Sequence, residues 1–292
     1  MRSPGELRLS NLEMIERRSF DGGVRVSVLG VGCGRVGSIS NPVPMREIKA
    51  TLEAAVEAGI NVFDTADIYG QSDSERTLSR LLRRYRDRMF VVTKVGGCYG
   101  RHSRIIRLTK PLLRTMVRSK PQARSAFMRA RTAVVSHNFH PPDLLRAVDG
   151  SRHRLALDQL DGLLLHNPSL ETLHNPEIHD LLGEFLHSGR VTHVGASVAS
   201  LLEVEAALAI PMLTILQVPV AVANALVGTV ILDDIRRRNI GVFVREILTG
   251  LRPGAYPLRE IVSAAIAPDF ITSAIIGLST RQHLDELLWA IS

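Results

Sequence analysis

The chain alternates between short apolar runs, which are typical of buried strands, and longer amphipathic stretches, which are typical of helices. Apolar strands separated by helices predict a parallel sheet that is covered on both faces. The predicted strands are Val26–Gly32, Asn61–Asp64, Met89–Lys94, Asp161–His166, Val191–Ser197, Leu213–Val218, Ile240–Arg245 and Ser273–Gly277. Eight such units in 292 residues predict a single closed (β/α)8 TIM barrel domain over residues 1–292.

A Gly-Gly pair near the N-terminus predicts a β-hairpin ahead of the barrel. In the run SFDGGVRVSV, Gly22 and Gly23 separate two β-prone stretches, and such a pair is typical of a tight hairpin turn. We therefore expect Arg17–Gly32 to form an N-terminal hairpin whose second arm continues as the first barrel strand.

The positive charge of the chain is concentrated in one segment. The net charge is +7, but residues 98–142 hold ten Lys and Arg residues and no Asp or Glu, and the rest of the chain has 26 basic against 29 acidic residues. A basic surface over the whole protein, as nucleic-acid binding requires, is therefore not indicated. The basic segment belongs to a long insertion, at about residues 97–140, that follows the third strand.

The cysteines and the apolar stretches bear on where the protein resides. Two cysteines, Cys33 and Cys98, and an N-terminus without an apolar segment predict a cytoplasmic protein with free thiols. Residues 206–232 carry no charge and are long enough to cross a membrane. Proline and amide residues interrupt this stretch, so we predict no membrane span but the end of a helix, a buried strand, a loop and the start of another helix.

Most of the predicted strands end in a polar residue. The six residues are Asp64, Lys94, His166, Ser197, Gln217 and Arg245. Tyr69 follows Asp64 in the next loop. The strand ends of a (β/α)8 barrel meet at one face, which carries the catalytic residues in this fold, so we expect these side chains to converge there. A buried lysine needs a negative partner, and Asp64 on the preceding strand can supply it.

Each of these residues also has a purely structural interpretation. A lysine after a strand is often exposed, a histidine there is often a satisfied structural group, Asp64 could cap a turn, and Tyr69 could be a packing residue. The joint pattern favours a catalytic mouth.

Several motifs, in order along the chain, carry a family resemblance. They are AGINVFDTADIYGQSDSERTLSRLL, VVTK, LLLHNP, GRVTHVGAS and AIIGLSTRQHLDELL. From about residue 17 to the C-terminus, the chain resembles the aldo-keto reductase superfamily. The resemblance implies an NADP(H)-dependent oxidoreductase that interconverts a carbonyl group (aldehyde, ketone or sugar hemiacetal) and an alcohol or lactone by hydride transfer.

The resemblance implies a catalytic tetrad of Asp64, Tyr69, Lys94 and His166. Tyrosine titrates near pH 10 in water, and a neighbouring ammonium lowers that pKa, so Lys94 would help Tyr69 act as a general acid and base. Asp64 would hold Lys94, and His166 would orient the carbonyl oxygen by a hydrogen bond.

The resemblance also implies a cofactor site. Ser197 and Gln217 would hold the nicotinamide carboxamide, and Arg245 would lie against the nicotinamide ring. The remaining expected cofactor contacts are Leu248, Gly277, Ser279, Arg281, His283 and Glu286. Arg281 and His283 could pair with a 2′-phosphate, which favours NADP over NAD. The family often has Asn where this chain has Val198, Ala221 and Leu287, and these departures imply weaker cofactor binding.

The insertion adds to the family core, which needs only a loop and a helix between Lys94 and His166. It contains the cationic amphipathic run RIIRLTKPLLRTMVR and leaves from the mouth of the barrel. Two interpretations stay open: a solvated surface flap, or a lid or docking surface for an acidic substrate or partner.

Two other motifs are discounted. The run from Gly32 to Gly37 spells GxGxxG, a dinucleotide-fold fingerprint, but Pro42 and Pro44 prevent a helix from opening there. His137 and His140 have a spacing that could ligate a metal, but no Cys or carboxylate cluster accompanies them, so we predict no metal.

Two alternative functions stay open beside the small-molecule oxidoreductase. One is a cofactor-binding barrel that serves as a regulatory or docking subunit with little turnover. The other is a lyase with Lys94 as a Schiff base, which is disfavoured because Asp64 would keep the amine charged. The residues do not identify the substrate, the reaction direction or the oligomeric state.

Overall fold

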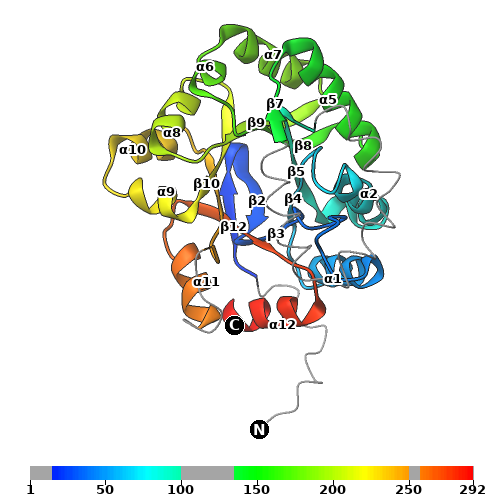
Figure 1. Cartoon of the computed structure of the whole chain (residues 1–292). Helices are drawn as coiled ribbons and strands as arrows, with labels where there is room; N and C mark the ends of the chain where they lie inside the picture. Colours follow the sequence, from blue (N-terminus) through cyan, green and yellow to red (C-terminus); the bar gives the residue numbers. More distant parts are fainter. Residues whose placement is uncertain (1–14, 100–134, 250–256, 292) are drawn as a thin grey trace.

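The computed structural model describes residues 15–99, 135–249 and 257–291. Within these ranges, parallel strands close into a barrel in the order β10-β11-β12-β3-β4-β5-β8-β9, and helices surround it (Figure 1). The barrel strands are β3 (Leu29–Gly32), β4 (Val62–Asp64), β5 (Phe90–Val95), β8 (Leu160–His166), β9 (Val191–Ser197), β10 (Leu213–Pro219), β11 (Gly241–Arg245) and β12 (Ile271–Gly277). The predicted (β/α)8 barrel is confirmed.

The helices pack their apolar sides on the outer face of the barrel. They are α1 (Met45–Glu57), α2 (Asp73–Tyr85), α5 (Pro141–Leu155), α6 (Leu170–Leu173), α7 (Pro176–His187), α8 (Leu201–Leu208), α9 (Val220–Ala225), α10 (Val230–Arg237), α11 (Leu258–Ile266) and α12 (Arg281–Ile291). In α2, Leu78, Leu81 and Leu82 recur at helical spacing and are buried. Side-chain N-caps stabilise the first turns of two later helices. The Asn175 side chain accepts from a backbone N–H at the start of α7, and the Ser200 side chain does the same at the start of α8.

The inside of the barrel has an apolar layer below a polar one. Val62, Val92, Leu164 and Ile215 belong to a buried apolar cluster. Side chains alternate along a strand, so the residue two positions further on points the same way. On β4, β5, β8 and β10 these next inward positions are Asp64, Lys94, His166 and Gln217. The strand pattern thus places the polar residues above an apolar floor.

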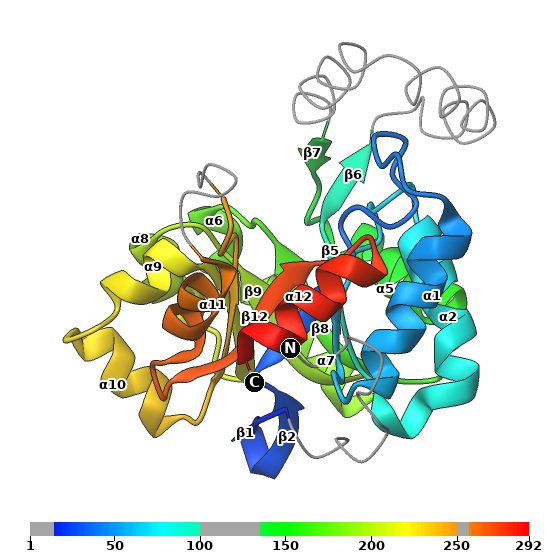
Figure 2. The ribbon, with the colours of Figure 1, turned by 90° about the horizontal axis from the view of Figure 1, so that it is seen from below.

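An N-terminal hairpin closes the opposite end of the barrel. It consists of β1 (Arg17–Phe20) and β2 (Val24–Ser27), joined by the 3-10 turn η1 (Asp21–Gly23). Phe20 is fully buried, and its ring meets Phe90 and Phe243 edge to face, each at 5.9 Å between centroids. A Cβ atom at Gly241 would lie 2.8 Å from the Phe20 ring, so this close approach requires glycine. Figure 2 shows this hairpin beneath the barrel.

The structure corrects the predicted first strand. Val26–Gly32 is not one strand, because β2 ends at Ser27 and β3 begins at Leu29. Val28 N–H donates to Glu16 O, and the Asn61 side chain accepts from Ser27 N–H at 2.7 Å. These bonds turn the chain from the hairpin into the barrel. After β3, the first helix, α1, begins only at Met45, which agrees with discounting the GxGxxG run.

The structure confirms part of the prediction for the uncharged residues 206–232. It contains the end of α8, strand β10 and the start of α10, as predicted, but the expected loop contains the helix α9. In the described ranges, no helix is long and apolar enough to cross a membrane.

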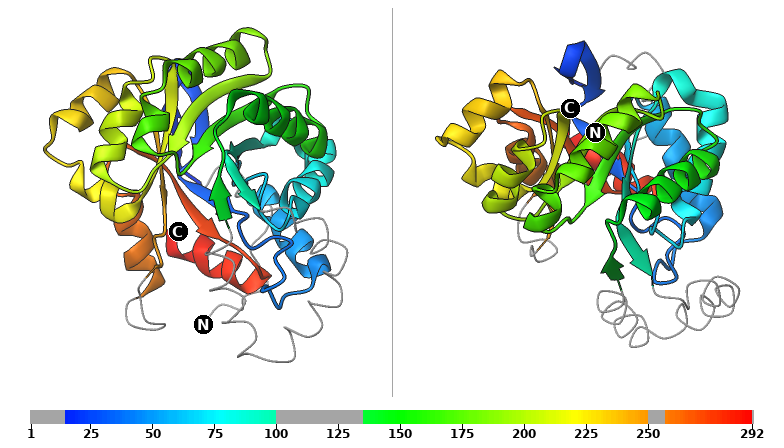
Figure 3. Two further views of the ribbon diagram at one scale, coloured as in Figure 1. Left: turned by 45° about the horizontal axis from the view of Figure 1, so that its top comes forward. Right: turned by 90° about the horizontal axis from the view of Figure 1, so that it is seen from above.

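A second hairpin, which the sequence did not indicate, stands at the mouth. It pairs β6 (Gly97–Tyr99) with β7 (Val135–His137) in antiparallel fashion. Figure 3 shows the two hairpins at opposite ends of the barrel. The predicted basic flap, lid or docking surface falls mostly on residues 100–134, outside the described residues.

Truncation of Phe20 tests the role of the first hairpin. We expect Phe20→Ala to lower the free energy of unfolding by about 3–5 kcal/mol, because it removes a buried ring and leaves a cavity. Urea denaturation followed by circular dichroism measures this change. Val230→Ala, at a position that is 82% exposed, is the control and should stay within about 0.5 kcal/mol of the parent. A loss as small as the control's would refute the role of Phe20.

Candidate active site

A buried ion pair lies at the centre of the mouth. Lys94 is 1% exposed, and its Nζ lies 2.5 Å from Asp64 Oδ1 on the neighbouring strand. The same ammonium donates to Thr65 O at 3.0 Å and to Tyr69 Oη at 3.4 Å. All three N–H bonds of the ammonium therefore have an acceptor, which is the condition for keeping such a charge in a barrel interior.

The loop after β4 places the phenol of Tyr69 over Lys94. Asp67 N–H donates to Lys94 O at 3.2 Å, and Tyr69 N–H donates to Ala66 O at 3.1 Å. These bonds fold the loop back across β5. As a result, Lys94 Nζ lies 5.0 Å from the centroid of the Tyr69 ring.

His166 faces Tyr69 from the end of β8. The two rings meet edge to face, with 5.8 Å between centroids and an angle of 84°. Burial, followed by the charge of Lys94, lowers the pKa of His166 to about 3. Its Nδ1 atom is buried and has no hydrogen-bond partner among the described residues. The imidazole is therefore neutral at physiological pH and can donate or accept one further hydrogen bond.

The ion pair sets the protonation of Lys94 and Tyr69. Burial by itself lowers the pKa of Lys94, but the charges of Asp64 and then Tyr69 outweigh it and hold this pKa above its ordinary value. For Tyr69, burial raises the pKa, and the opposing effect of Lys94 does not cancel it. Lys94 thus lowers the pKa of Tyr69 as expected, but burial, which the sequence did not reveal, outweighs it. Tyr69 is a protonated donor whose conjugate phenolate has an ammonium beside it.

Ser197 and Gln217 form a chain that ends on the same carboxylate. Ser197 Oγ donates to Gln217 Oε1 at 2.9 Å, and Gln217 Nε2 donates to Asp64 Oδ1 at 2.8 Å. Both side chains are buried. Asp64 is thereby held from two sides of the barrel. A hydroxyl and an amide on adjacent strand ends are also the donor and acceptor pair that a nicotinamide carboxamide needs.

Arg245 stands at the rim beside them. Its guanidinium donates to Val198 O at 3.1 Å and pairs with Glu246, whereas its Nε is buried without a hydrogen-bond partner among the described residues. The unpaired Nε marks a place where a polar ligand group would fit.

The other expected cofactor residues follow the last two barrel strands. Leu248 lies after β11 and is 43% exposed, and Gly277 ends β12. Ser279 is buried and accepts from Asn41 Nδ2 at 3.4 Å. Arg281 and His283 are exposed in the first turn of α12, where Arg281 pairs with Asp285 at 2.8 Å. Glu286, also exposed, accepts from Gln282 at 2.8 Å. A helix N-terminus with two basic side chains suits a phosphate.

A sequence profile of the Aldo/keto reductase family matches residues 28–287. This chain belongs to the aldo/keto reductase family. Over 172 residues it is 32% identical to D-threo-aldose 1-dehydrogenase of a Pseudomonas species, a match that covers 54% of this chain and 43% of that protein. Over 160 residues it is 27% identical to pyridoxal 4-dehydrogenase of Microbacterium luteolum, covering 54% of this chain and 44% of that protein. The matches thus span less than half the length of these curated relatives.

A solved structure supports the fold over nearly the whole length. An aldo-keto reductase from Klebsiella pneumoniae in complex with NADPH superposes on this aldo/keto reductase with a TM-score of 0.67 at 18% identity. The superposition covers 95% of this chain and 89% of that one.

Two buried carboxyl groups behind the candidate tetrad were missed from the sequence. Glu75 is fully buried, accepts from Thr93 Oγ1 at 2.7 Å and pairs with Arg154 at 2.5 Å. Burial, followed by the charge of Glu75, raises the pKa of Asp67 to about 8. The acids in FDTADIYG and SDSE were visible in the sequence, but their burial was not.

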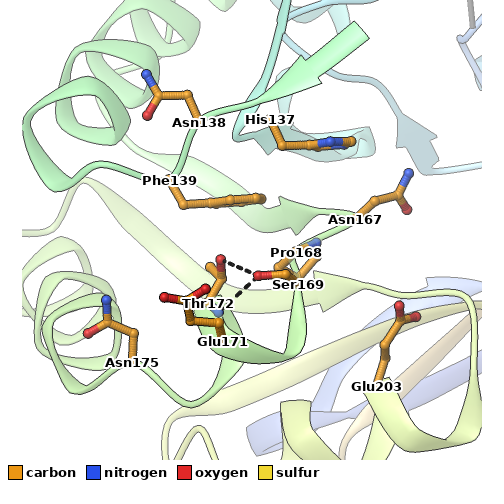
Figure 4. A pocket seen from close by; sticks show the side chains of 10 residues that line it. All are labelled: His137, Asn138, Phe139, Asn167, Pro168, Ser169, Glu171, Thr172, Asn175 and Glu203. Atoms are coloured by element: carbon orange, nitrogen blue, oxygen red, sulfur yellow. Dashed lines mark hydrogen bonds between the residues drawn. The ribbon is translucent and has the colours of Figure 1, made fainter. Parts of the chain in front are cut away.

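A cleft beside His166 also escaped the sequence analysis. It has a volume of about 530 Å³ and is shown in Figure 4. The lining residues are His137, Asn138, Phe139, Asn167, Pro168, Ser169, Glu171, Thr172, Asn175 and Glu203. Asn167 and Pro168 belong to the quoted motif LLLHNP, but nothing in the sequence places them opposite the β6–β7 hairpin.

Neither Cys33 nor the histidine pair gains a catalytic partner. Cys33 is fully buried, and burial raises the pKa of its thiol, so it is a packing residue. Among the residues that the structure describes, no group of three or more His, Cys, Asp or Glu could hold a metal.

The pKa of Asp67 predicts a pH-dependent stability. Its pKa is about 8 in the folded protein and about 3.8 when exposed, so the protonated carboxyl stabilises the fold at low pH. This contribution is fully present below pH 3.8 and is lost as the pH rises from there to about 8, by up to about 1.4 kcal/mol per pH unit, with no further loss above pH 8. We therefore expect Asp67→Asn to gain stability relative to the parent between pH 5 and pH 8.

Urea denaturation at several pH values measures the difference. Asp180→Asn, which changes an exposed carboxyl on α7, is the control and should show no such trend. A constant difference between Asp67→Asn and the parent across this pH range would contradict the raised pKa.

Proposed function

We propose that this protein is an NADP(H)-dependent oxidoreductase that interconverts an aldehyde, ketone or sugar hemiacetal and the corresponding alcohol or lactone. One observation carries the proposal. The hydroxyl of Tyr69 is in contact with an ammonium that Asp64 fixes, and a neutral imidazole stands opposite. NADPH, when bound, supplies the hydride for this chemistry.

The four tetrad side chains donate the proton and orient the carbonyl group, both of which the hydride transfer requires. Reduction puts a hydride on the carbonyl carbon, and the oxygen then needs a proton, which Tyr69 Oη donates. Lys94 stabilises the resulting phenolate through its charge, and Asp64 keeps Lys94 in place. The N–H of neutral His166 donates to the carbonyl oxygen and orients it. In the oxidation direction, the phenolate of Tyr69 accepts the proton of the alcohol.

The cofactor contacts follow from the residues at the mouth. Ser197 and Gln217 would hold the nicotinamide carboxamide, with Arg245 beside it. Leu248, Gly277, Ser279 and Glu286 would hold the rest of the cofactor, and Arg281 and His283 would bind the 2′-phosphate, which favours NADP over NAD. The NADPH complex of the Klebsiella pneumoniae relative supports this choice. Val198 offers no polar atom where the family often has Asn, so we expect fast exchange of the cofactor.

A sugar hemiacetal is the substrate that the comparisons favour. The relative with 32% identity is named for an aldose. Oxidation of the sugar at the hemiacetal carbon gives a lactone. Asp64, Tyr69, Lys94 and His166 have the same roles in this reaction as in the oxidation of an alcohol.

Replacement of Tyr69 separates binding from chemistry. We expect Tyr69→Phe to bind NADPH with nearly the parent affinity and to lose about 10²–10⁴-fold in turnover, because the ring stays while the proton donor is removed. Fluorescence titration measures the first quantity, and the nicotinamide absorbance with a carbonyl substrate measures the second.

Tyr85→Phe is the matched control for this substitution. Tyr85 donates to Glu53 and Glu57 on the outer face of the barrel, at 3.2 and 3.0 Å, so its replacement should leave turnover unchanged. Full turnover in Tyr69→Phe would remove this phenol from the reaction.

A further inference from the structure

The cleft beside His166 is built from three separate parts of the chain. The end of the β6–β7 hairpin supplies His137, Asn138 and Phe139, the segment after β8 supplies residues 167–175, and α8 supplies Glu203. Figure 4 shows these side chains around one hollow. Among the described residues that line it, none is Lys or Arg and two are carboxylates. The cleft therefore suits a neutral ligand better than an anionic one.

The cleft begins at Asn167, the residue after His166. Asn167 has a left-handed backbone, with φ of 49°, while its N–H donates to Ser197 O at 3.0 Å. Asn tolerates this conformation better than most residues. On the other side, Gly97 packs against His166, since a Cβ there would lie 3.3 Å from Nδ1, and Gly97 pairs with His137. A substrate whose carbonyl reaches His166 can thus extend into the cleft.

The ring of Phe139 is fixed as one wall. A Cβ at Gly96, whose φ is 98°, would lie only 2.1 Å from the Phe139 ring, so the bare glycine backbone packs against the ring edge. Phe139 also stacks on His137, with an interplanar angle of 3° and 6.2 Å between centroids. In Figure 4 the other face of the Phe139 ring looks across the hollow toward Ser169 and Thr172. A flat apolar face of this kind can pack against the C–H face of a sugar ring.

Two polar side chains of the cleft are fixed by hydrogen bonds, and each keeps a further polar atom for a ligand. Asn175 Oδ1 accepts from Glu177 N–H at 2.9 Å, and Glu203 Oε2 accepts from Ala199 N–H at 2.7 Å. Within the described residues, Asn175 Nδ2, Glu203 Oε1 and the Asn167 amide make no hydrogen bond. The helix caps therefore order these side chains in advance, which lowers the entropy cost of binding.

We propose that this cleft is a saccharide subsite that binds the hydroxyl-bearing part of the substrate away from the reacting carbon. Sugar hydroxyls both donate and accept hydrogen bonds. The amides of Asn167 and Asn175 provide donors, the carboxylates of Glu171 and Glu203 provide acceptors, and Phe139 provides the stacking face. The inference rests on the proposed function and names the part of the substrate that this cleft selects.

The test compares two carbonyl substrates in variants that preserve the backbone. Asn167→Gly keeps the left-handed conformation and removes the amide, and Phe139→Leu keeps an apolar side chain over Gly96 and removes the flat ring. The substrates are galactose, oxidised with NADP+, and 4-nitrobenzaldehyde, which has no hydroxyl groups and is reduced with NADPH. Asn239→Gly is the matched control, because Asn239 also has a positive φ, of 52°, but its N–H bonds to Arg236 O, away from the cleft.

We expect both cleft variants to lower kcat/KM for galactose by about tenfold or more, mainly through KM, which corresponds to about 1.4 kcal/mol. The value for 4-nitrobenzaldehyde and both values for Asn239→Gly should stay within about twofold of the parent. Saturation-transfer NMR with galactose reads the same subsite without turnover, and the signal should be lost in Asn167→Gly.

Two results overturn the subsite. One is an unchanged kcat/KM for galactose in both cleft variants, and the other is a parent protein that reduces 4-nitrobenzaldehyde but neither oxidises nor binds galactose. In either case the proposed function stands. A different result would contradict the proposed function, namely no consumption of NADPH with 4-nitrobenzaldehyde.

Discussion

The active mouth depends on the buried contact between Lys94 and Asp64. Removing an ammonium from water costs several kcal/mol, and a carboxylate on the next strand offsets this cost only when the geometry is close. Adjacent parallel strands supply that geometry, and Gln217 holds the same carboxylate from across the barrel. The position of Tyr69 follows from this pair, since the ammonium binds both the Thr65 carbonyl and the phenol. Loss of Asp64 would leave a buried charge without a partner and would release the phenol as well.

The two ends of the barrel have different roles: one end contains the apolar residues that stabilise the fold, and the other contains the polar residues of the candidate site. At one end, Phe20 and the apolar layer above it close the interior. At the other end, the inward positions become polar within two residues on each strand, so the same strands that bury the floor also present the tetrad. The β6–β7 hairpin extends the mouth sideways and creates the cleft lined by Phe139 and Asn167.

The sequence revealed most of the barrel and the convergent mouth, because both follow from local patterns. Strands of apolar residues with a polar last residue must expose that residue at a common end once the sheet is parallel. Features that depend on contacts between distant segments of the chain could not be predicted from local sequence patterns. The break at Val28 depends on bonds to Glu16 and Asn61, the β6–β7 hairpin pairs segments far apart in the chain, and the pKa of Tyr69 depends on how deeply the phenol is buried. The charge of Lys94 acts in the expected direction on the pKa of Tyr69, but burial outweighs it.

The most direct test of the central claim is a crystal structure of this protein with NADP+ bound. The account predicts that the nicotinamide ring lies at the mouth, with its carboxamide on Ser197 and Gln217 and with Tyr69 Oη and His166 facing its reactive carbon. The Lys94–Asp64 contact should be unchanged. A nicotinamide bound outside the mouth, or a Lys94 ammonium separated from Asp64 and Tyr69 in that complex, would contradict the account.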